Sequence, residues 1–251
     1  MEIFVQARKD GYNVLFPKAT PKEFYKFASD LQSASAKNDS KYYGKNFYSL
    51  AFAEGGFIFT KYVIGYDIQR NNIGNVGISV FIPVTQKLSG DDVKKLLDEL
   101  ISAYCQNYCD DNKITNKRED WQLFTSVLKR YELLQGDNFN DSLITVGSKE
   151  PAFHYYKNDR ELIDLFGNPF QEEYAGFKQV FFIDIELKDT TNPLDIIKNS
   201  GVEVNPDLKN EYYYLNNYNS SKEIKITANG MMRSEKKGEN KIRAKWVVEI
   251  K

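Results

Sequence analysis

The stretch FYSLAFAEGGFIFTKYVIGY, residues 47–66, contains two runs of aromatic and aliphatic residues on either side of Glu54-Gly55-Gly56. Such runs are typical of β-strands, and the two glycines suit a tight turn between them. We therefore expect strands over residues 47–52 and 57–66. A third run, 76–83, follows the polar segment 70–75, whose Asn and Gly residues tolerate a positive φ. This stretch predicts a sheet whose strands are mainly antiparallel.

The clearest helix signal follows directly and begins at Ser89, which forms the capping-box pattern with Asp92. Apolar residues then keep a three–four spacing for four turns, at Val93, Leu96, Leu97, Leu100, Ile101, Tyr104 and Tyr108. A second capping box, Thr20 to Glu23, predicts a helix to about residue 36, and another helix is expected over 118–134. These patterns predict amphipathic helices that pack one face on the sheet.

The ends of the chain supply further strands. Asp10-Gly11 lies between apolar runs at 2–7 and 12–16, which is a strong hairpin signal. In the second half, strands are expected at 152–156 and 179–187, with a short helix over 159–166 between them. Because helices and strands mix without strict alternation, the fold class is α+β, with mixed, mainly antiparallel sheets.

The polar segment 135–150, with one short strand expected at 143–146, suggests a boundary between two subdomains. We expect an α+β subdomain over residues 1–135 and a smaller α+β subdomain over 136–251. The second would end in a long basic β-hairpin, made of residues 223–227 and 242–250.

The composition excludes several classes of protein. The 251 residues include 34 Lys or Arg, 35 Asp or Glu and one His, a net charge of −1. This excludes a uniformly basic protein that coats nucleic acid, and we find no specific nucleic-acid signal. With no run of 18 apolar residues, no transmembrane segment is expected within the chain. The two cysteines, Cys105 and Cys109, lie four apart in a helical pattern, and free thiols fit a cytoplasmic location.

Catalytic motifs are sparse. The lone histidine, His154, lies in the aromatic run 153–156 and has two interpretations, a general base or a hydrogen-bonded strand residue. The second is favoured. With no second histidine in the sequence, a histidine-based zinc site is not expected. A phosphate-binding loop and a nucleophile elbow are both missing from the sequence. We therefore predict no catalytic residue, no metal and no cofactor.

The segment 66–75 is the most polar stretch of an otherwise apolar region. Its amides and its arginine suit contact with an anion or a peptide, although a plain hairpin loop also explains it. The predicted partner-binding residues are Asp67, Arg70, Asn71, Asn72 and Asn75.

Residues 6–15 (QARKDGYNVL), 67–70 (DIQR) and Gly74-Asn75 before the third strand together resemble a known family. They are similar to the N-terminal domains of prokaryotic GTPase-associated proteins of conflict systems, over about the first 110 residues. In that family, a glutamine-containing strand and a glycine hairpin precede an Arg-Gly-Asn type of turn. The family's histidine after this turn is replaced here by Val76-Gly77-Ile78. The resemblance implies a non-enzymatic adaptor.

The C-terminal region is basic: residues 221–251 contain nine Lys or Arg and four Glu. The candidate anion-binding residues of the expected hairpin are Lys236, Lys237, Lys241, Arg243 and Lys245. They would contact an anionic lipid or nucleic acid, flank a downstream membrane anchor, or protect a solvated edge hairpin, the last being favoured. Because the chain stops within the strand-like run 246–251, we expect it to be the N-terminal part of a longer protein.

Together these features favour a non-catalytic protein–protein interaction or regulatory module, with a protein partner still to be identified. One alternative is a hydrolase with an unfamiliar site, in which at least two of Asp67, Arg70 and His154 meet. The other is an anion- or lipid-binding module that acts through the basic hairpin.

Overall fold

The computed structural model describes residues 1–8, 12–17, 45–67, 71–86, 88–110, 113–114, 121–132, 134, 147, 151–174, 176–188 and 202–204. These residues belong to one compact unit, Met1–Val204. The helix expected over 20–36, the strand over 143–146 and the basic C-terminal hairpin lie outside the described residues.

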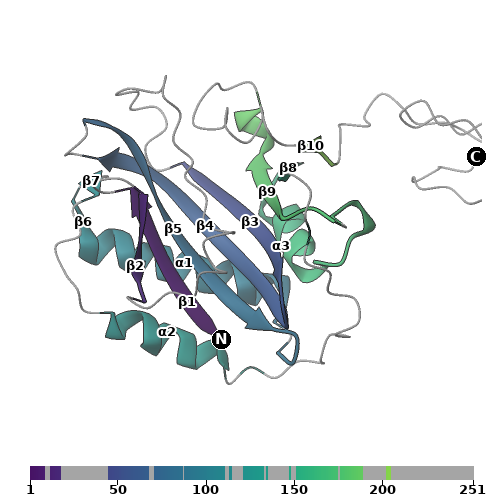
Figure 1. The fold of residues 1–251 in the computed structure, drawn as a ribbon, viewed down its shortest axis with the longest axis horizontal. Coiled ribbons are helices and arrows are strands. Elements are labelled where there is room, and N and C mark those ends of the chain that lie inside the picture. Colours follow the sequence, from purple (N-terminus) through teal and green to yellow (C-terminus); the bar gives the residue numbers. More distant parts are fainter. Residues whose placement is uncertain are drawn as a thin grey trace, which may run out of the picture. The chain divides into compact units, whose positions relative to one another are not determined.

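One mixed sheet organises this unit, with the strand order β10-β8-β9-β3-β4-β5-β1-β2 (Figure 1). The strands are β1 (Glu2–Arg8), β2 (Tyr12–Phe16), β3 (Asn46–Ala53), β4 (Gly56–Asp67), β5 (Asn72–Pro83), β6 (Cys109–Asp110), β7 (Lys113–Ile114), β8 (Ala152–Tyr156), β9 (Gln179–Asp184) and β10 (Val202–Glu203). The pairs from β9 to β2 along this order are antiparallel, whereas β8 lies parallel to both β9 and β10. The prediction of an α+β fold with a mainly antiparallel sheet is confirmed.

The quoted stretch forms the centre of this sheet as a meander of β3, β4 and β5. Gly55 has a φ of 75° in the turn between β3 and β4, which a residue with a Cβ would adopt only under strain. Strand β5 begins at Asn72, four residues earlier than predicted, because Asn71 takes the left-handed conformation (φ 49°) and completes the turn after β4. Strand β9 ends at Asp184, whose side chain accepts a hydrogen bond from the Glu186 amide and starts a 3₁₀ turn, η5 (Ile185–Leu187).

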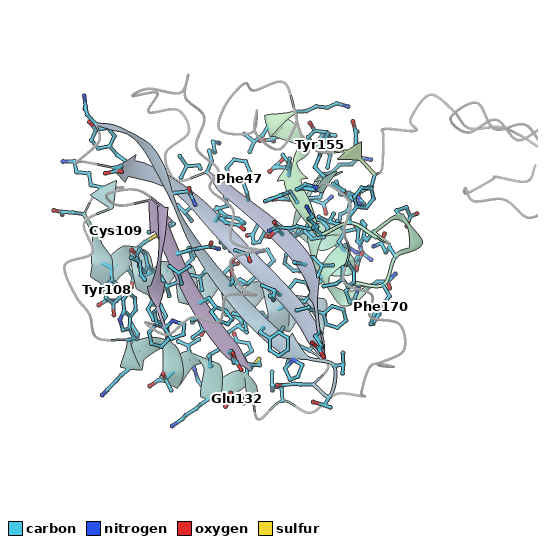
Figure 2. All side chains as sticks on the ribbon, in the orientation of Figure 1. Phe47, Tyr108, Cys109, Glu132, Tyr155 and Phe170 are labelled. Atoms are coloured by element: carbon cyan, nitrogen blue, oxygen red, sulfur yellow. The ribbon has the colours of Figure 1, made fainter. Side chains whose placement is uncertain are left out.

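The helices are α1 (Gly90–Tyr108), α2 (Gln122–Glu132) and α3 (Asp159–Gly167), with a further 3₁₀ turn, η4 (Glu172–Tyr174). The predicted capping box is present at the start of α1, where Ser89 and Asp92 bond each other's backbone amides. Residues Leu50, Phe59 and Val80 are neighbours in register and face the apolar stripe of α1. All three helices contribute to this one core, and side chains fill the space between them and the sheet (Figure 2).

The opposite face of the sheet carries a buried polar row. Ser49, Thr60 and Ser79 are neighbours in register on β3, β4 and β5, and Thr60 Oγ1 lies 2.7 Å from Ser79 Oγ. Gln6 donates to Ser79 at 3.1 Å, and Gln179 donates to Ser49 at 2.7 Å. All five side chains are buried. Their mutual hydrogen bonds offset the free energy that burying polar groups costs.

Strands from both sides of residue 135 share the sheet, because β9 pairs with β3 through Tyr48 and Phe182. The division into subdomains 1–135 and 136–251 stays a prediction. Within the part of the chain that the structure describes, no helix combines the length and the apolar character needed to cross a bilayer.

Candidate functional site

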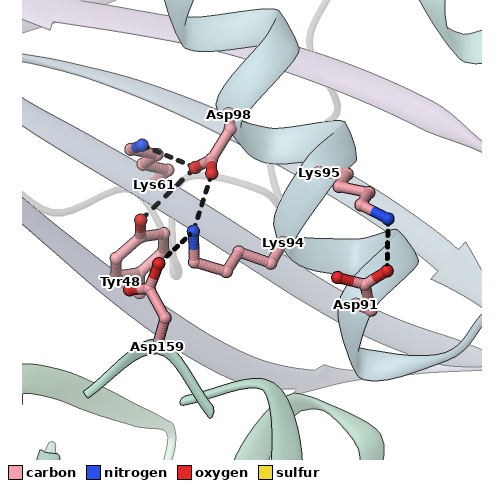
Figure 3. Close-up of polar contacts among 7 residues, drawn as sticks. All are labelled: Tyr48, Lys61, Asp91, Lys94, Lys95, Asp98 and Asp159. Carbon is pink, nitrogen blue, oxygen red and sulfur yellow. Dashed lines mark hydrogen bonds and ion pairs between the residues drawn. The ribbon is translucent and has the colours of Figure 1, made fainter. Parts of the chain in front are cut away.

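A cluster of charged residues lies where the sheet meets α1 and α3; it consists of Tyr48, Lys61, Lys94, Asp98 and Asp159 (Figure 3). Lys61 Nζ lies 2.6 Å from Asp98 Oδ1, and Lys94 Nζ lies 2.9 Å from Asp98 Oδ2. Lys94 also pairs with Asp159 at 3.0 Å, and the Tyr48 hydroxyl donates to Asp98 at 3.4 Å. We call this group the charged cluster. One carboxylate, Asp98, thus joins two ammonium groups and a phenol from three elements.

Local structure explains how the cluster assembles. Tyr48 and Lys61 are direct partners across β3 and β4, on the face that the helices cover. Lys61 Nζ therefore also lies 5.3 Å from the centroid of the Tyr48 ring. Lys94 and Asp98 stand four residues apart on α1, so they share one face of that helix. Asp159 is the first residue of α3 and is largely exposed.

Burial makes these pairs unusual. The Lys61 side chain is only 9% exposed, and Lys94 is 15% exposed, whereas Asp98 keeps 36% of its side chain in contact with solvent. Removing an ammonium group from water costs on the order of several kcal/mol, and a well-placed countercharge offsets part of this cost. Asp98 supplies that countercharge at the solvent boundary.

Burial and neighbouring charges shift the pKa values of three members of the cluster. Burial raises the pKa of Asp98, but the hydrogen bonds from Lys61 and Lys94 outweigh it and lower the pKa below its usual value. Burial lowers the pKa of Lys94, yet the bonds to Asp98 and Asp159 raise it overall. Burial first, and the charge of Asp98 second, raise the pKa of Tyr48 far above that of a free phenol. Near neutral pH, Lys94 is therefore charged, Asp98 is ionised and the Tyr48 hydroxyl keeps its proton.

Sequence reasoning missed this cluster, although one signal was present. Lys61 lies between Thr60 and Tyr62 in a run rich in aromatic and aliphatic residues, and β4 is buried on both faces at this point. Its partner, Asp98, is 37 residues away, and no spacing rule connects a strand lysine with a helix aspartate over that separation.

His154 is buried on β8, and its Nδ1 lies 2.8 Å from the Tyr174 hydroxyl. Burial lowers its pKa, while the charges of Glu161 and Glu173 oppose that shift. The imidazole is therefore neutral at pH 7 and packed against the rings of Tyr174 and Phe182. The interpretation as a hydrogen-bonded strand histidine matches this environment.

The residues that the sequence predicts to bind a partner differ in their burial. Asp67 and Asn75 lie within β4 and β5 and are fully buried. Asn71 is exposed and accepts a hydrogen bond from the Tyr66 hydroxyl. Asn72 begins β5 opposite Asp67, but its side chain, like the whole of Arg70, lies outside the described residues.

The structure does not bring His154 and Asp67 together. His154, Phe182, Tyr48 and Lys61 form one row across β8, β9, β3 and β4, so three strand spacings separate His154 from β4. Asp67 lies six residues further along β4. At about 4.8 Å per strand and about 3.3 Å per residue, the two side chains start about 25 Å apart.

Cys105 and Cys109 are free thiols, as predicted, and each is partly buried. The Cys109 thiol donates a hydrogen bond to Cys105, which lowers the pKa of Cys105 against the effect of burial and raises that of Cys109. Over the described ranges, no three acidic, histidine or cysteine side chains gather as a metal site would require.

The candidate anion-binding residues Lys236, Lys237, Lys241, Arg243 and Lys245 lie outside the described residues.

Comparison with known proteins gives no match, whether with family models, with curated proteins or with solved structures.

Proposed function

We propose that this chain is a non-catalytic, cytoplasmic module for protein–protein interaction or regulation. The observation that carries the proposal is the β4–β5 hairpin. Its two 12-residue strands pair over their full length and end in a polar turn at which Asn71 is exposed. Polar loops that a rigid scaffold positions are common recognition surfaces.

The charged cluster supports a structural rather than a chemical role for its members. Lys61 and Lys94 both donate to Asp98, and Lys94 also pairs with Asp159. The shifted pKa values keep Lys94, Asp98 and Tyr48 in fixed protonation states. A general base or a nucleophile instead needs a pKa near the working pH.

The aromatic residues of the described part mostly fill the core. Among the side chains that the structure describes, the exposed large hydrophobic ones are Leu123 and Leu134, each 40% exposed. The partner surface that we propose is therefore polar, and the turn is the part of it that this structure indicates. The resemblance of residues 6–15, 67–70 and 74–75 to GTPase-associated proteins of conflict systems suggests a non-enzymatic adaptor.

The proposal is tested by affinity capture from a prokaryotic lysate with the chain and two variants as baits. Arg70→Ala combined with Asn71→Gly removes both side chains, and glycine accepts the positive φ of residue 71. Lys95→Ala, on the exposed face of α1, serves as the matched control. We expect a protein captured by the wild type and by the control to be lost with the double variant. Equal capture by all three baits would contradict the assignment of the turn.

A further inference from the structure

The segment Asn158–Tyr174, which contains α3 and η4, connects two neighbouring strands of the sheet. Strand β8 precedes it and β9 follows it, and these two strands pair in parallel. We call it the α3–η4 segment. A connection between parallel neighbours has to cross the sheet from one end of the first strand to the opposite end of the second. The segment therefore packs next to the part of the sheet that β8 and β9 form (Figure 1).

Three aromatic side chains of the segment, each four residues after the last, pack against the strands: Phe166, Phe170 and Tyr174. Phe166 lies edge-on to Phe182 of β9, with ring centroids 5.6 Å apart. Phe170 lies edge-on to Phe57, next to the turn before β4, at 5.0 Å. Tyr174 is fully buried and lies 6.0 Å from Phe182. These ring contacts carry no charge, so a change of pH leaves them unaltered.

Tyr174 also makes a polar contact with the sheet. Its hydroxyl oxygen lies 2.8 Å from Nδ1 of His154 on β8, and both side chains are buried. The two rings are in edge contact as well, with centroids 5.9 Å apart. Histidine is the side chain whose charge ordinarily changes between pH 5 and 8. The α3–η4 segment is thus bonded to the sheet through a group that can change its charge.

A proton on His154 works against this contact. A neutral imidazole has one N–H donor and one acceptor nitrogen, whereas the protonated ring has two donors and no acceptor. Protonation also gives the ring a positive charge at a place from which Tyr174 and Phe182 exclude water. A buried charge without solvation is costly, and movement of the segment away from β8 would return the imidazolium to water.

The charges around His154 reduce this cost without removing it. Burial lowers the pKa of His154, whereas Glu161 of α3 and Glu173 of η4 oppose that shift. Glu161 also accepts a hydrogen bond from the Lys157 amide at 2.8 Å, and Glu173 is exposed. Strand β9 contributes the uncharged ring of Phe182. When the segment is open, the imidazole regains the ordinary histidine pKa of about 6.5, so a falling pH favours opening.

We propose that His154 and Tyr174 form an acid-sensitive latch, which holds the α3–η4 segment on the sheet while His154 is neutral and releases it when His154 binds a proton. Release uncovers the rings of Phe57 and Phe182. The latch operates between about pH 6.5 and about pH 4, a range in which Asp98 of the charged cluster stays ionised. It is a property of the fold and does not rest on the function proposed above.

Native-state hydrogen exchange of the full chain between about pH 5 and about pH 7 tests the latch, after correction for the intrinsic pH dependence of amide exchange. We expect the amides of α3 to open more often than those of α1. Because one proton drives release, the opening constant of α3 should rise by up to about tenfold for each pH unit below 6.5. Low concentrations of urea should raise the opening of α1 and leave that of α3 unchanged, since local opening exposes little surface.

The wild type alone can overturn the proposal. If α3 and α1 share one opening constant and one urea dependence at about pH 5, the proton acts on the whole fold and no latch exists. An opening constant of α3 that does not change with pH would overturn it equally. Neither result needs a variant that folds or a binding partner.

Two variants assign the effect to His154. His154→Gln keeps a hydrogen-bonding side chain without a titrating charge, so the opening of α3 should lose its pH dependence. Asp159→Asn is the matched control, because it breaks the pair between Lys94 and the first residue of α3 and leaves the imidazole unchanged. It should keep the pH dependence of the wild type. A dependence that persists in His154→Gln, or that disappears in Asp159→Asn, would overturn the assignment.

Discussion

Lys61 Nζ lies 2.6 Å from Asp98 Oδ1, so a nearly buried ammonium on the central strand β4 is neutralised by a carboxylate on α1. The pair links the sheet to the helix that covers it. Lys94 bonds the second oxygen of the same carboxylate and extends the link to Asp159 of α3. Asp98 is therefore the residue on which the charged cluster depends.

Removal of Asp98 should destabilise the fold, because it leaves Lys61 buried without its countercharge. We expect Asp98→Ala to lower the free energy of unfolding by about 1–3 kcal/mol, less than for a fully buried pair since Asp98 is partly exposed. Urea denaturation of the variant and the wild type measures this. Asp91→Ala, which breaks the exposed pair with Lys95, is the control and should cost less than about 0.5 kcal/mol. Equal losses for the two variants would contradict the role of Asp98.

Stability should also decline in acid through Asp98. Because the pKa of Asp98 is lower in the folded chain than the usual 3.8, the unfolded chain binds its proton first as the pH falls. The stabilisation is thus complete above the usual pKa and is lost as the pH falls below about 4. Unfolding measurements at a series of pH values should show the difference between the wild type and Asp98→Asn shrinking over that range. A difference that stays constant down to the acid limit would show that the charge of Asp98 is not involved.

His154 should titrate below the ordinary pKa of histidine. It is the one histidine of the chain, so its imidazole proton signals in an NMR pH titration need no assignment. Since burial lowers the pKa of the folded-state imidazole from 6.5, the unfolded chain binds the proton more readily. The stability that depends on neutral His154 is complete above about pH 6.5 and is lost as the pH falls toward the folded-state pKa. Tyr174→Phe is a useful companion variant, because it removes the hydrogen bond to Nδ1 and keeps the ring. A titration midpoint at or above 6.5 in the wild type would contradict the burial argument.

The crossing of α1 and α3 should depend on Gly90. A Cβ at this position would lie 1.9 Å from the Ile163 carbonyl oxygen, so the two helices would have to separate. We expect Gly90→Ala to destabilise the chain by about 1–3 kcal/mol, the usual cost of overpacking, as measured by thermal or urea denaturation. Gly167→Ala is the matched control on the other helix, because its nearest atom would be 3.6 Å away and the contact would be ordinary. Similar stabilities for both variants would show that the helices can move apart freely.

Local patterns predicted the elements of this fold because each depends on residues close in sequence. The strand runs in 47–66, the capping box at Ser89 and the helix over 159–166 all appear close to their predicted places. The errors also have local causes. Asn71 adopts a positive φ and lets β5 start early, and Asp184 caps a 3₁₀ turn that ends β9.

The candidate site was less predictable than the fold. The pattern predicts Asp67 and Asn75 as polar loop residues, yet both lie within strands and are fully buried. Lys61 is a charged residue in a mainly apolar strand, and its burial is explained only by its contact with Asp98. In each case the decisive partner is distant in sequence or depends on the register of a strand.

The sequence by itself determined where strands and helices form, because periodicity, caps and turn residues act over a few positions. The tertiary structure alone decided that β9 pairs with β3, that Tyr48 faces Lys61, and that Asp98 reaches both. Strand order and register determine these contacts, and a shift of β4 by one residue would move Lys61 to the other face of the sheet. The pattern of the chain therefore fixes the elements, whereas their packing creates the charged cluster.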